Sequence, residues 1–246
     1  MSGARRGILE PTIFALVGIA ILIGLGVWQL DRKTWKENLI AAMTTRLARA
    51  PADLPPRDRW AQLKPEGEEF ARVGFPAEFL AGQEALVYSA GSAFRPDVKG
   101  PGYFVFAPAR LAGGSLVIVN RGFVPLDRKD PASRAQGESH GSVDIVGIVR
   151  WPETRGIFTP ADDPTNNVWY LRDIAAIAAA RHWQNVAPFY VEQESPVPPG
   201  GLPQPGKLVV NLPDNHLQYA ITWFGLALAL AGVFLLFIVR RLRRHY

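Results

Sequence analysis

The chain has 246 residues, a formal net charge of +5 at pH 7 and no cysteine. The absence of cysteine excludes a thiolate nucleophile, a disulfide framework and a cysteine-based zinc site, and with only two methionines it also disfavours a dedicated Cu(I) site. The positive charge does not indicate a nucleic-acid partner, because much of it lies beside two apolar segments at the ends of the chain.

Two uncharged apolar runs predict membrane spans. Residues 12–30 form the first run, and residues 216–239, which begin with His216, contain the second. Each has about 20 residues, enough at a rise of about 1.5 Å per residue to cross a hydrocarbon core of roughly 30 Å. No small-x-small cleavage site follows the first run, so we predict an uncleaved anchor rather than a signal peptide.

Basic residues beside the spans predict their orientation. They are Arg5 and Arg6 before the first span, and Arg240, Arg241, Arg243 and Arg244 after the second. Because basic flanks stay on the cytoplasmic side, residues 1–11 and the tail 240–246 are expected in the cytoplasm and residues 31–215 outside it. Three basic residues weigh the other way but are outnumbered: Arg32, Lys33 and Lys36. Residues 31–215 then lie in the bacterial periplasm or in the mitochondrial intermembrane space.

The first span is predicted to continue as a helix beyond the membrane. Apolar residues recur every four positions from Trp35 to Leu47, and Ala50-Pro51 ends the pattern. This helix either packs on the domain that follows or lies on the membrane surface.

The middle of the chain alternates short extended runs with turn residues. Strands are predicted at residues 70–80, 84–89, 102–107, 115–121, 143–150, 169–171, 188–192 and 207–210. Asp173 is expected to cap a helix that ends at His182 or Trp183. The sequence therefore predicts a two-span antiparallel helical hairpin with an inserted extracytoplasmic α+β domain, mainly antiparallel β, for which a small barrel is one architecture.

His216 is the sharpest candidate for a functional residue. On a helix, one face carries His216, Tyr219 or Ala220, Trp223 and Ala227. Because the spans are antiparallel, Trp28 and Gln29 are expected at the same depth as His216. An imidazole among aromatic and small residues suits a flat metal macrocycle such as haem. The alternative is an ordinary aromatic belt at the membrane interface with a hydrated histidine.

Arg121 is the second candidate. It ends a predicted strand before Gly122, where it can hold a carboxylate or a haem propionate through paired hydrogen bonds. The alternative is a structural turn in which Gly122 takes a positive φ and Arg121 pairs internally. His140 lacks an acid partner and a GxSxG elbow, and Glu153 with the acidic pair at 162–163 matches no EF-hand spacing, so no enzyme activity is predicted.

Four stretches, in this order, resemble one family. They are residues 26–30 (GVWQL) with basic and aromatic residues at 32–36, residues 102–103 leading to 119–125 (VNRGFVP), residues 167–173 (NVWYLRD), and residues 215–227 (NHLQYAITWFGLA). Together they resemble the Surfeit locus protein 1 family, the membrane assembly factors of cytochrome c oxidase. Phe123 departs from the family pattern, which usually has Trp at this position.

The resemblance implies a non-enzymatic role in placing haem a into cytochrome c oxidase subunit I. It implies that His216 is the axial ligand of the haem iron, with Trp28 and Gln29 as neighbours. Tyr219 and Trp223 can wall the macrocycle, and Arg32, Lys33 or Arg121 facing the propionates is a further hypothesis. The partners expected are subunit I, haem A synthase and the lipid bilayer of a bacterial inner membrane. The rival interpretation is a structural scaffold for subunit I intermediates that binds no haem.

Overall fold

The structure is a computed structural model that describes residues 2–92, 94–210 and 214–243, with side chains described from residue 9 onward. The chain divides into two compact units, one formed by Met1–Ala42 with Leu212–Tyr246 and the other by Met43–Asn211. Of the basic flanking residues, Arg244 and the side chains of Arg5 and Arg6 lie outside the described part. We call the two parts the helical unit and the barrel unit.

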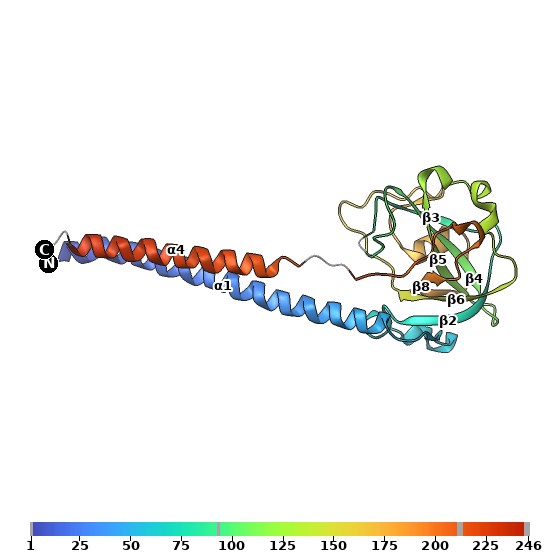
Figure 1. The fold of residues 1–246 in the computed structure, drawn as a ribbon, viewed down its shortest axis with the longest axis horizontal. Coiled ribbons are helices and arrows are strands. Elements are labelled where there is room, and N and C mark those ends of the chain that lie inside the picture. The colour runs from blue at the N-terminus through green and yellow to red at the C-terminus, as the bar shows by residue number, and fades with distance from the viewer. Residues whose placement is uncertain (1, 93, 211–213, 244–246) are drawn as a thin grey trace. The chain divides into compact units, whose positions relative to one another are not determined.

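The helical unit is an antiparallel pair of long apolar helices. Helix α1 covers Ser2–Leu47 and helix α4 covers His216–Arg243, and they lie side by side (Figure 1). A Cβ added at Gly26 would lie 2.5 Å from the Phe224 ring, and one at Gly18 would lie 3.1 Å from Leu230. Residues later in α1 thus contact residues earlier in α4, which shows that the two helices are antiparallel. The predicted hairpin is confirmed.

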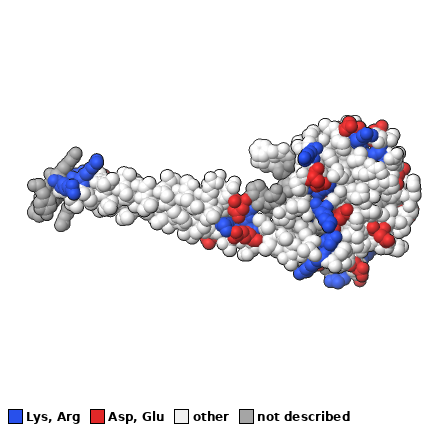
Figure 2. Space-filling view, in the orientation of Figure 1, with Lys and Arg blue, Asp and Glu red and all other residues white. Residues whose placement is uncertain are grey.

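Both helices are long and apolar enough to cross a membrane, each with a mean hydropathy of 2.4 over its most apolar stretch. Small residues occupy the shared face, where Ala15, Ala220 and Ala227 are buried. Small side chains let helix backbones approach closely. Helices in a membrane associate through such close packing, because the surrounding lipid tails are as apolar as leucine and give no hydrophobic driving force. Most large apolar side chains instead face outward, and Figure 2 shows an uncharged surface along the pair between its charged ends.

The barrel unit contains the strands and the short helices. Its strands are β1 (Ala52–Asp53), β2 (Arg72–Phe79), β3 (Ala85–Ser89), β4 (Gly102–Arg110), β5 (Leu116–Pro125), β6 (Ser142–Arg150), β7 (Val168–Trp169) and β8 (Val186–Ser195). Its helices are α2 (Pro65–Glu68) and α3 (Ile174–Ala180), with 3-10 turns η1 (Arg57–Gln62), η2 (Leu126–Arg128), η3 (Pro131–Gly137) and η4 (Pro199–Gly201).

Within the described residues these strands form one sheet in the order β1-β2-β6-β8-β5-β4-β3-β7. Pairing of Glu78 and Phe79 on β2 with Arg110 and Ala109 on β4 closes β2, β6, β8, β5 and β4 into a barrel. Strands β5 and β8 run parallel, whereas the other barrel pairs are antiparallel. The predicted α+β domain is confirmed, in the form of a mixed five-stranded barrel.

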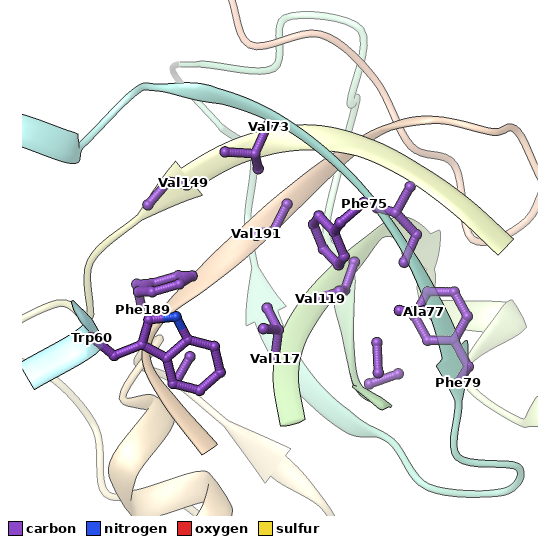
Figure 3. Close-up of a cluster of buried hydrophobic side chains, with 14 residues drawn as sticks. Trp60, Val73, Phe75, Ala77, Phe79, Val117, Val119, Val149, Phe189 and Val191 are labelled. Atoms are coloured by element: carbon purple, nitrogen blue, oxygen red, sulfur yellow. The ribbon is translucent and has the colours of Figure 1, made fainter. Parts of the chain in front are cut away.

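Alternation along the strands gives the barrel two apolar surfaces. The inward residues form one core, in which Trp60 from η1 closes over Phe189 with ring centroids 5.8 Å apart (Figure 3). The outward residues of β3, β4, β5 and β8 form a second core, which α3 and Trp169 cover. Asp173 caps α3 as predicted, because its carboxylate accepts a hydrogen bond from the backbone N–H of Ala176 at 3.0 Å.

The C-terminal end of α1 belongs to the barrel unit. Met43 and Leu47 pack against Phe70, Ile148 and Leu208. Of the two alternatives for the continued helix, packing on the domain is therefore the one observed for this last turn.

One predicted strand is absent, and several observed strands run beyond their predicted ends. Residues 207–210 form no strand, although the Val209 N–H donates to the carbonyl of Phe94 at 2.8 Å. Strand β5 does not stop at Arg121 but runs on to Pro125. It passes Gly122 at a φ of +125°, where a Cβ would lie 2.1 Å from the carbonyl oxygen of Gln204. Glycine therefore lets the strand continue beneath a crossing segment instead of starting a turn.

Candidate functional site

One side-chain hydrogen bond joins the two helices of the helical unit. His216 Nδ1 donates to Gln29 Oε1 at 2.7 Å. When one ring nitrogen of a neutral histidine donates, the other carries the lone pair. The contact therefore leaves His216 Nε2 as the atom able to bind a metal.

The sequence puts both residues there through helical periodicity. On α1 the residues turned toward α4 recur at Ala15, Gly18, Leu22, Gly26 and Gln29, three or four positions apart. The Gln29 side chain is 9% exposed on this otherwise apolar face, so its amide needs a polar partner. Helix α4 begins at His216 itself, where the Asp214 carboxylate accepts from the backbone N–H at 3.0 Å.

The aromatic candidates divide between two surfaces. Trp28 and Tyr219 are 56% and 54% exposed, on the outward surface near the Gln29–His216 pair. Ala220, rather than Tyr219, is buried on the shared face. Trp223 is half-buried, and its indole N–H is buried with no acceptor in the described part of the chain. Of the predicted set, the structure brings Gln29 and His216 into direct contact.

Basic residues follow the pair along α1. The guanidinium of Arg32 lies 3.9 Å from the centroid of the Trp35 ring, and Lys33 forms an ion pair with Glu37 at 2.5 Å. Exposed pairs of this kind contribute little to stability, so these groups can exchange partners at small cost.

Arg121 belongs to the barrel unit. Its side chain is buried, and its Nη2 donates to the Gly137 carbonyl at 2.6 Å and to Ser139 Oγ at 3.3 Å. Its guanidinium also stacks on the Phe79 ring at 4.6 Å. Internal pairing, one of the two alternatives, is therefore observed, whereas a contact of Arg121 with haem stays a prediction.

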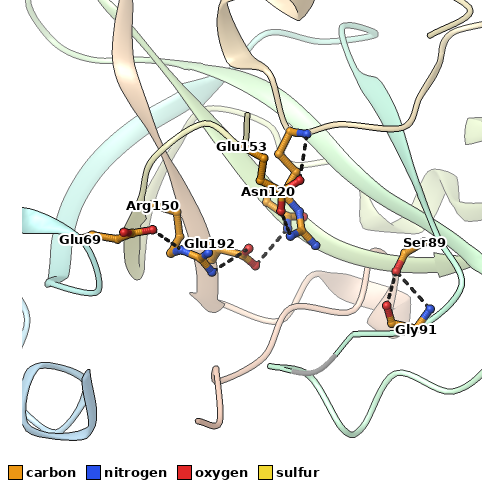
Figure 4. Close-up of polar contacts among 8 residues, drawn as sticks. Glu69, Ser89, Gly91, Asn120, Arg150, Glu153 and Glu192 are labelled. Carbon is orange, nitrogen blue, oxygen red and sulfur yellow. Dashed lines mark hydrogen bonds and ion pairs between the residues drawn. The ribbon is translucent and has the colours of Figure 1, made fainter. Parts of the chain in front are cut away.

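A buried polar network crosses β5, β8 and β6, and sequence reasoning missed it. Glu192 accepts from Asn120 Nδ2 at 3.0 Å and lies 4.0 Å from Arg150, which in turn pairs with Glu69 at 3.2 Å (Figure 4). Burial raises the pKa of the neighbouring Tyr190 phenol, which therefore stays neutral. The sequence signal that could have revealed this network was the presence of charged residues within otherwise apolar strands. The network joins strands of the barrel unit.

The other sequence candidates remain isolated. His140 is exposed in a loop, and His182 follows α3 with a φ of +58°. Among the described residues, no group of three or more His, Asp or Glu side chains is arranged to hold a metal ion.

The chain thus combines a hairpin of two helices that are long and apolar enough to cross a membrane with a barrel domain inserted between them in the sequence. The SURF1 family model matches residues 16–228. The chain is 36% identical to a SURF1-like protein of Monosiga brevicollis, covering 87% of this chain and 82% of the relative. It is 33% identical to Surfeit locus protein 1 of Rattus norvegicus (93% and 76%) and 32% identical to that of Homo sapiens (84% and 70%).

The chain therefore belongs to the SURF1 family. Members of this family are known as cytochrome c oxidase assembly factors and are generally non-enzymatic.

Proposed function

We propose that this protein is an oxidase assembly factor that binds haem a through His216 and helps to insert it into cytochrome c oxidase subunit I. The observation that carries the proposal is the 2.7 Å hydrogen bond from His216 Nδ1 to Gln29 Oε1. Metal-binding histidines almost always donate their second ring nitrogen in this way, which fixes the tautomer and the ring plane and raises the basicity of the ligand.

The surroundings of the histidine support a flat apolar cargo. Trp28, Tyr219 and Leu217 are each about half exposed beside the pair, and such surfaces suit contact with a macrocycle and with lipid. The buried indole N–H of Trp223 is a hydrogen-bond donor with no acceptor in the described chain. An oxygen-bearing substituent of the cargo would satisfy it.

A single histidine suits delivery as well as binding. Among the described residues of the helical unit, His216 is the only histidine, so these residues offer one imidazole ligand. Haem held by one such ligand dissociates more readily than haem held by two, and a carrier must release what it carries.

Placement in a membrane completes the proposal. The two apolar helices would span a bacterial inner membrane with both termini in the cytoplasm and the barrel unit in the periplasm. Three arginines in the last turn of α4 support this orientation. Haem A synthase would supply the cargo, and subunit I would receive it.

The proposal is tested with full-length protein purified from cells that make haem A. The His216→Ala variant is compared with the wild type and with His182→Ala, which removes an exposed histidine of the barrel unit. Haem A content and the Soret spectrum are expected to be lost only in His216→Ala, while far-UV circular dichroism stays unchanged. Wild-type haem content in His216→Ala would refute the proposal that His216 is the haem ligand. If oxidase assembly nevertheless failed in that variant, a scaffold that binds no haem would be favoured instead.

A further inference from the structure

A cavity of about 60 Å³ lies at one end of the barrel. Phe79 and Ala107, which belong to the apolar barrel interior, form its floor, and Arg121 and Arg134 form its wall. Gln83 and other exposed residues of the surrounding loops form its rim. A site needs about 10–15 Å³ to hold one water, so this cavity has room for roughly four waters or one very small organic molecule.

Arg121 is a buried cation that forms no ion pair with a carboxylate of the described residues. Its hydrogen bonds go to the backbone carbonyl of Gly137 and the hydroxyl of Ser139, which are both neutral. Its Nε–H is buried and has no acceptor in the described part of the chain. Burial lowers the pKa of the guanidinium, whereas the nearby Glu84 carboxylate raises it, and the group remains charged at neutral pH. Buried charges are normally paired, because an unpaired one costs several kcal/mol.

The nearest acidic residue is already engaged. Glu84 is only partly buried and forms an ion pair with Arg134, a residue that is itself buried. Glu138 lies on the exposed rim of the cavity. Glu84 therefore lies near both guanidinium groups but forms its ion pair with Arg134, while Arg121 donates its hydrogen bonds to neutral groups.

We propose that this cavity binds a small carboxylate, with the carboxylate on the Arg121 guanidinium and its apolar part on Phe79 and Ala107. Arg121 lines the cavity, and an arginine guanidinium can bind a planar carboxylate through paired hydrogen bonds. The floor is apolar and the volume is small, which favours a compact singly charged group over a phosphate. The site lies wholly in the barrel unit and does not depend on haem binding at His216.

Carboxylates reach such a site from two sources. One source is a free small acid, and the other is a carboxylate carried by a larger molecule whose remainder stays outside the rim. The chemistry at Arg121 is the same in both cases, so the experiment has an arm for each.

The first arm titrates ¹³C-acetate into full-length protein in nanodiscs at constant ionic strength, with chloride as the reference anion, and follows the acetate resonance. Saturable binding is expected in the wild type. Arg121→Gln is expected to weaken it at least about tenfold, since charged hydrogen bonds contribute about 1.5–3 kcal/mol. Arg110→Gln, which removes an exposed arginine at the end of β4, should leave it unchanged. No saturable signal in the wild type would overturn the proposal.

Two further variants guard against misfolding of Arg121→Gln. Arg121→Lys keeps the charge but has no Nε–H and no planar edge, so weaker binding is expected. Ala107→Val fills the floor without altering Arg121 and should also reduce binding. Wild-type affinity in both variants, with unchanged thermal unfolding, would contradict a site in this cavity.

The second arm adds a propionate-bearing porphyrin or its dimethyl ester to the acetate complex. Displacement by the free acid alone would assign the carboxylate to a larger molecule. Displacement by neither would assign it to a free small acid. Displacement by both porphyrins would show that the carboxylate is not what competes, and would overturn the proposal.

Discussion

Replacing Gln29 by leucine separates the hydrogen bond to His216 from the presence of the ligand itself. Leucine has a similar volume and suits an apolar helix face, but it offers no acceptor for His216 Nδ1–H. The imidazole would then be free to turn or to move its proton to Nε2, which removes the lone pair needed by the iron. Loss of such a supporting group typically costs about 10- to 100-fold in metal affinity.

The geometry of the hydrogen bond supports a loss of this size. The acceptor is 9% exposed and the bond is short at 2.7 Å, so water replaces it poorly. We therefore expect the dissociation constant for haem to rise about 10- to 100-fold, equivalent to about 1.4–2.7 kcal/mol. Gln29→Glu keeps an acceptor and should keep the affinity near that of the wild type. Its carboxylate would make the imidazole a stronger donor and lower the midpoint potential of the bound haem.

The assay is a Soret titration of full-length protein in nanodiscs, with a redox titration of the same samples. Gln218→Leu is the matched control, because it makes the same change at an exposed position of α4, two residues after His216. Wild-type affinity in Gln29→Leu would refute the argument, since it would mean that the hydrogen bond does not orient the ligand. Equal loss in Gln218→Leu would refute it too, because the effect would then be general to the helix.

Two stability predictions concern the barrel unit. Gly122→Ala should destabilise it by about 3 kcal/mol or more in thermal unfolding, because the new Cβ would lie 2.1 Å from the Gln204 carbonyl at a φ of +125°. Gly114→Ala, at a φ of +80° with open space around it, should cost only about 1–2 kcal/mol, and equal losses would contradict this reading. Two hydrogen bonds from Arg95, at 2.7 and 2.8 Å, hold the pKa of Asp97 below its ordinary value of 3.8, so its contribution to stability is present above about pH 4 and lost as the pH falls further. The unfolding free energy of Asp97→Asn should therefore fall less steeply than that of the wild type below pH 4, and parallel curves would count against the Asp97 contribution.

Local patterns in the sequence were sufficient for α1, α3 and α4, but not for the short helix α2. An uninterrupted apolar run and a four-residue repeat predicted both spans and the continuation of α1, and a single aspartate predicted the start of α3. The depth argument placed Gln29 opposite His216, because antiparallel helices that end at one surface have complementary numbering. These features depend on residues that are close in sequence, or on the antiparallel arrangement of the two helices in a hairpin.

The barrel depends on pairings that no local pattern contains. Strand β2 meets β4 to close it, and β5 lies parallel to β8 about 70 residues later. Arg121 illustrates the consequence for a site. The sequence showed that Arg121 lies in a strand and precedes a glycine. It did not show that Gly137 and Ser139, from a later loop, would contact Arg121 in the folded protein. Periodicity therefore predicted the wrong end for β5 and could not predict the cavity.

Under the proposed function, the Gln29–His216 contact is expected to contribute more to haem binding than to the helix pair. Hydrogen bonds between membrane helices average only about 0.6 kcal/mol, and close packing at Gly18, Gly26 and the buried alanines already joins α1 to α4. The same bond is expected to be worth about 1.4–2.7 kcal/mol to a metal on Nε2. A hairpin that needed only stability would do as well with an apolar pair at these positions. It follows that Gln29→Leu should leave the helix content and the thermal unfolding of the protein nearly unchanged while it weakens haem binding, and a hairpin that fell apart in this variant would mean that the bond is structural.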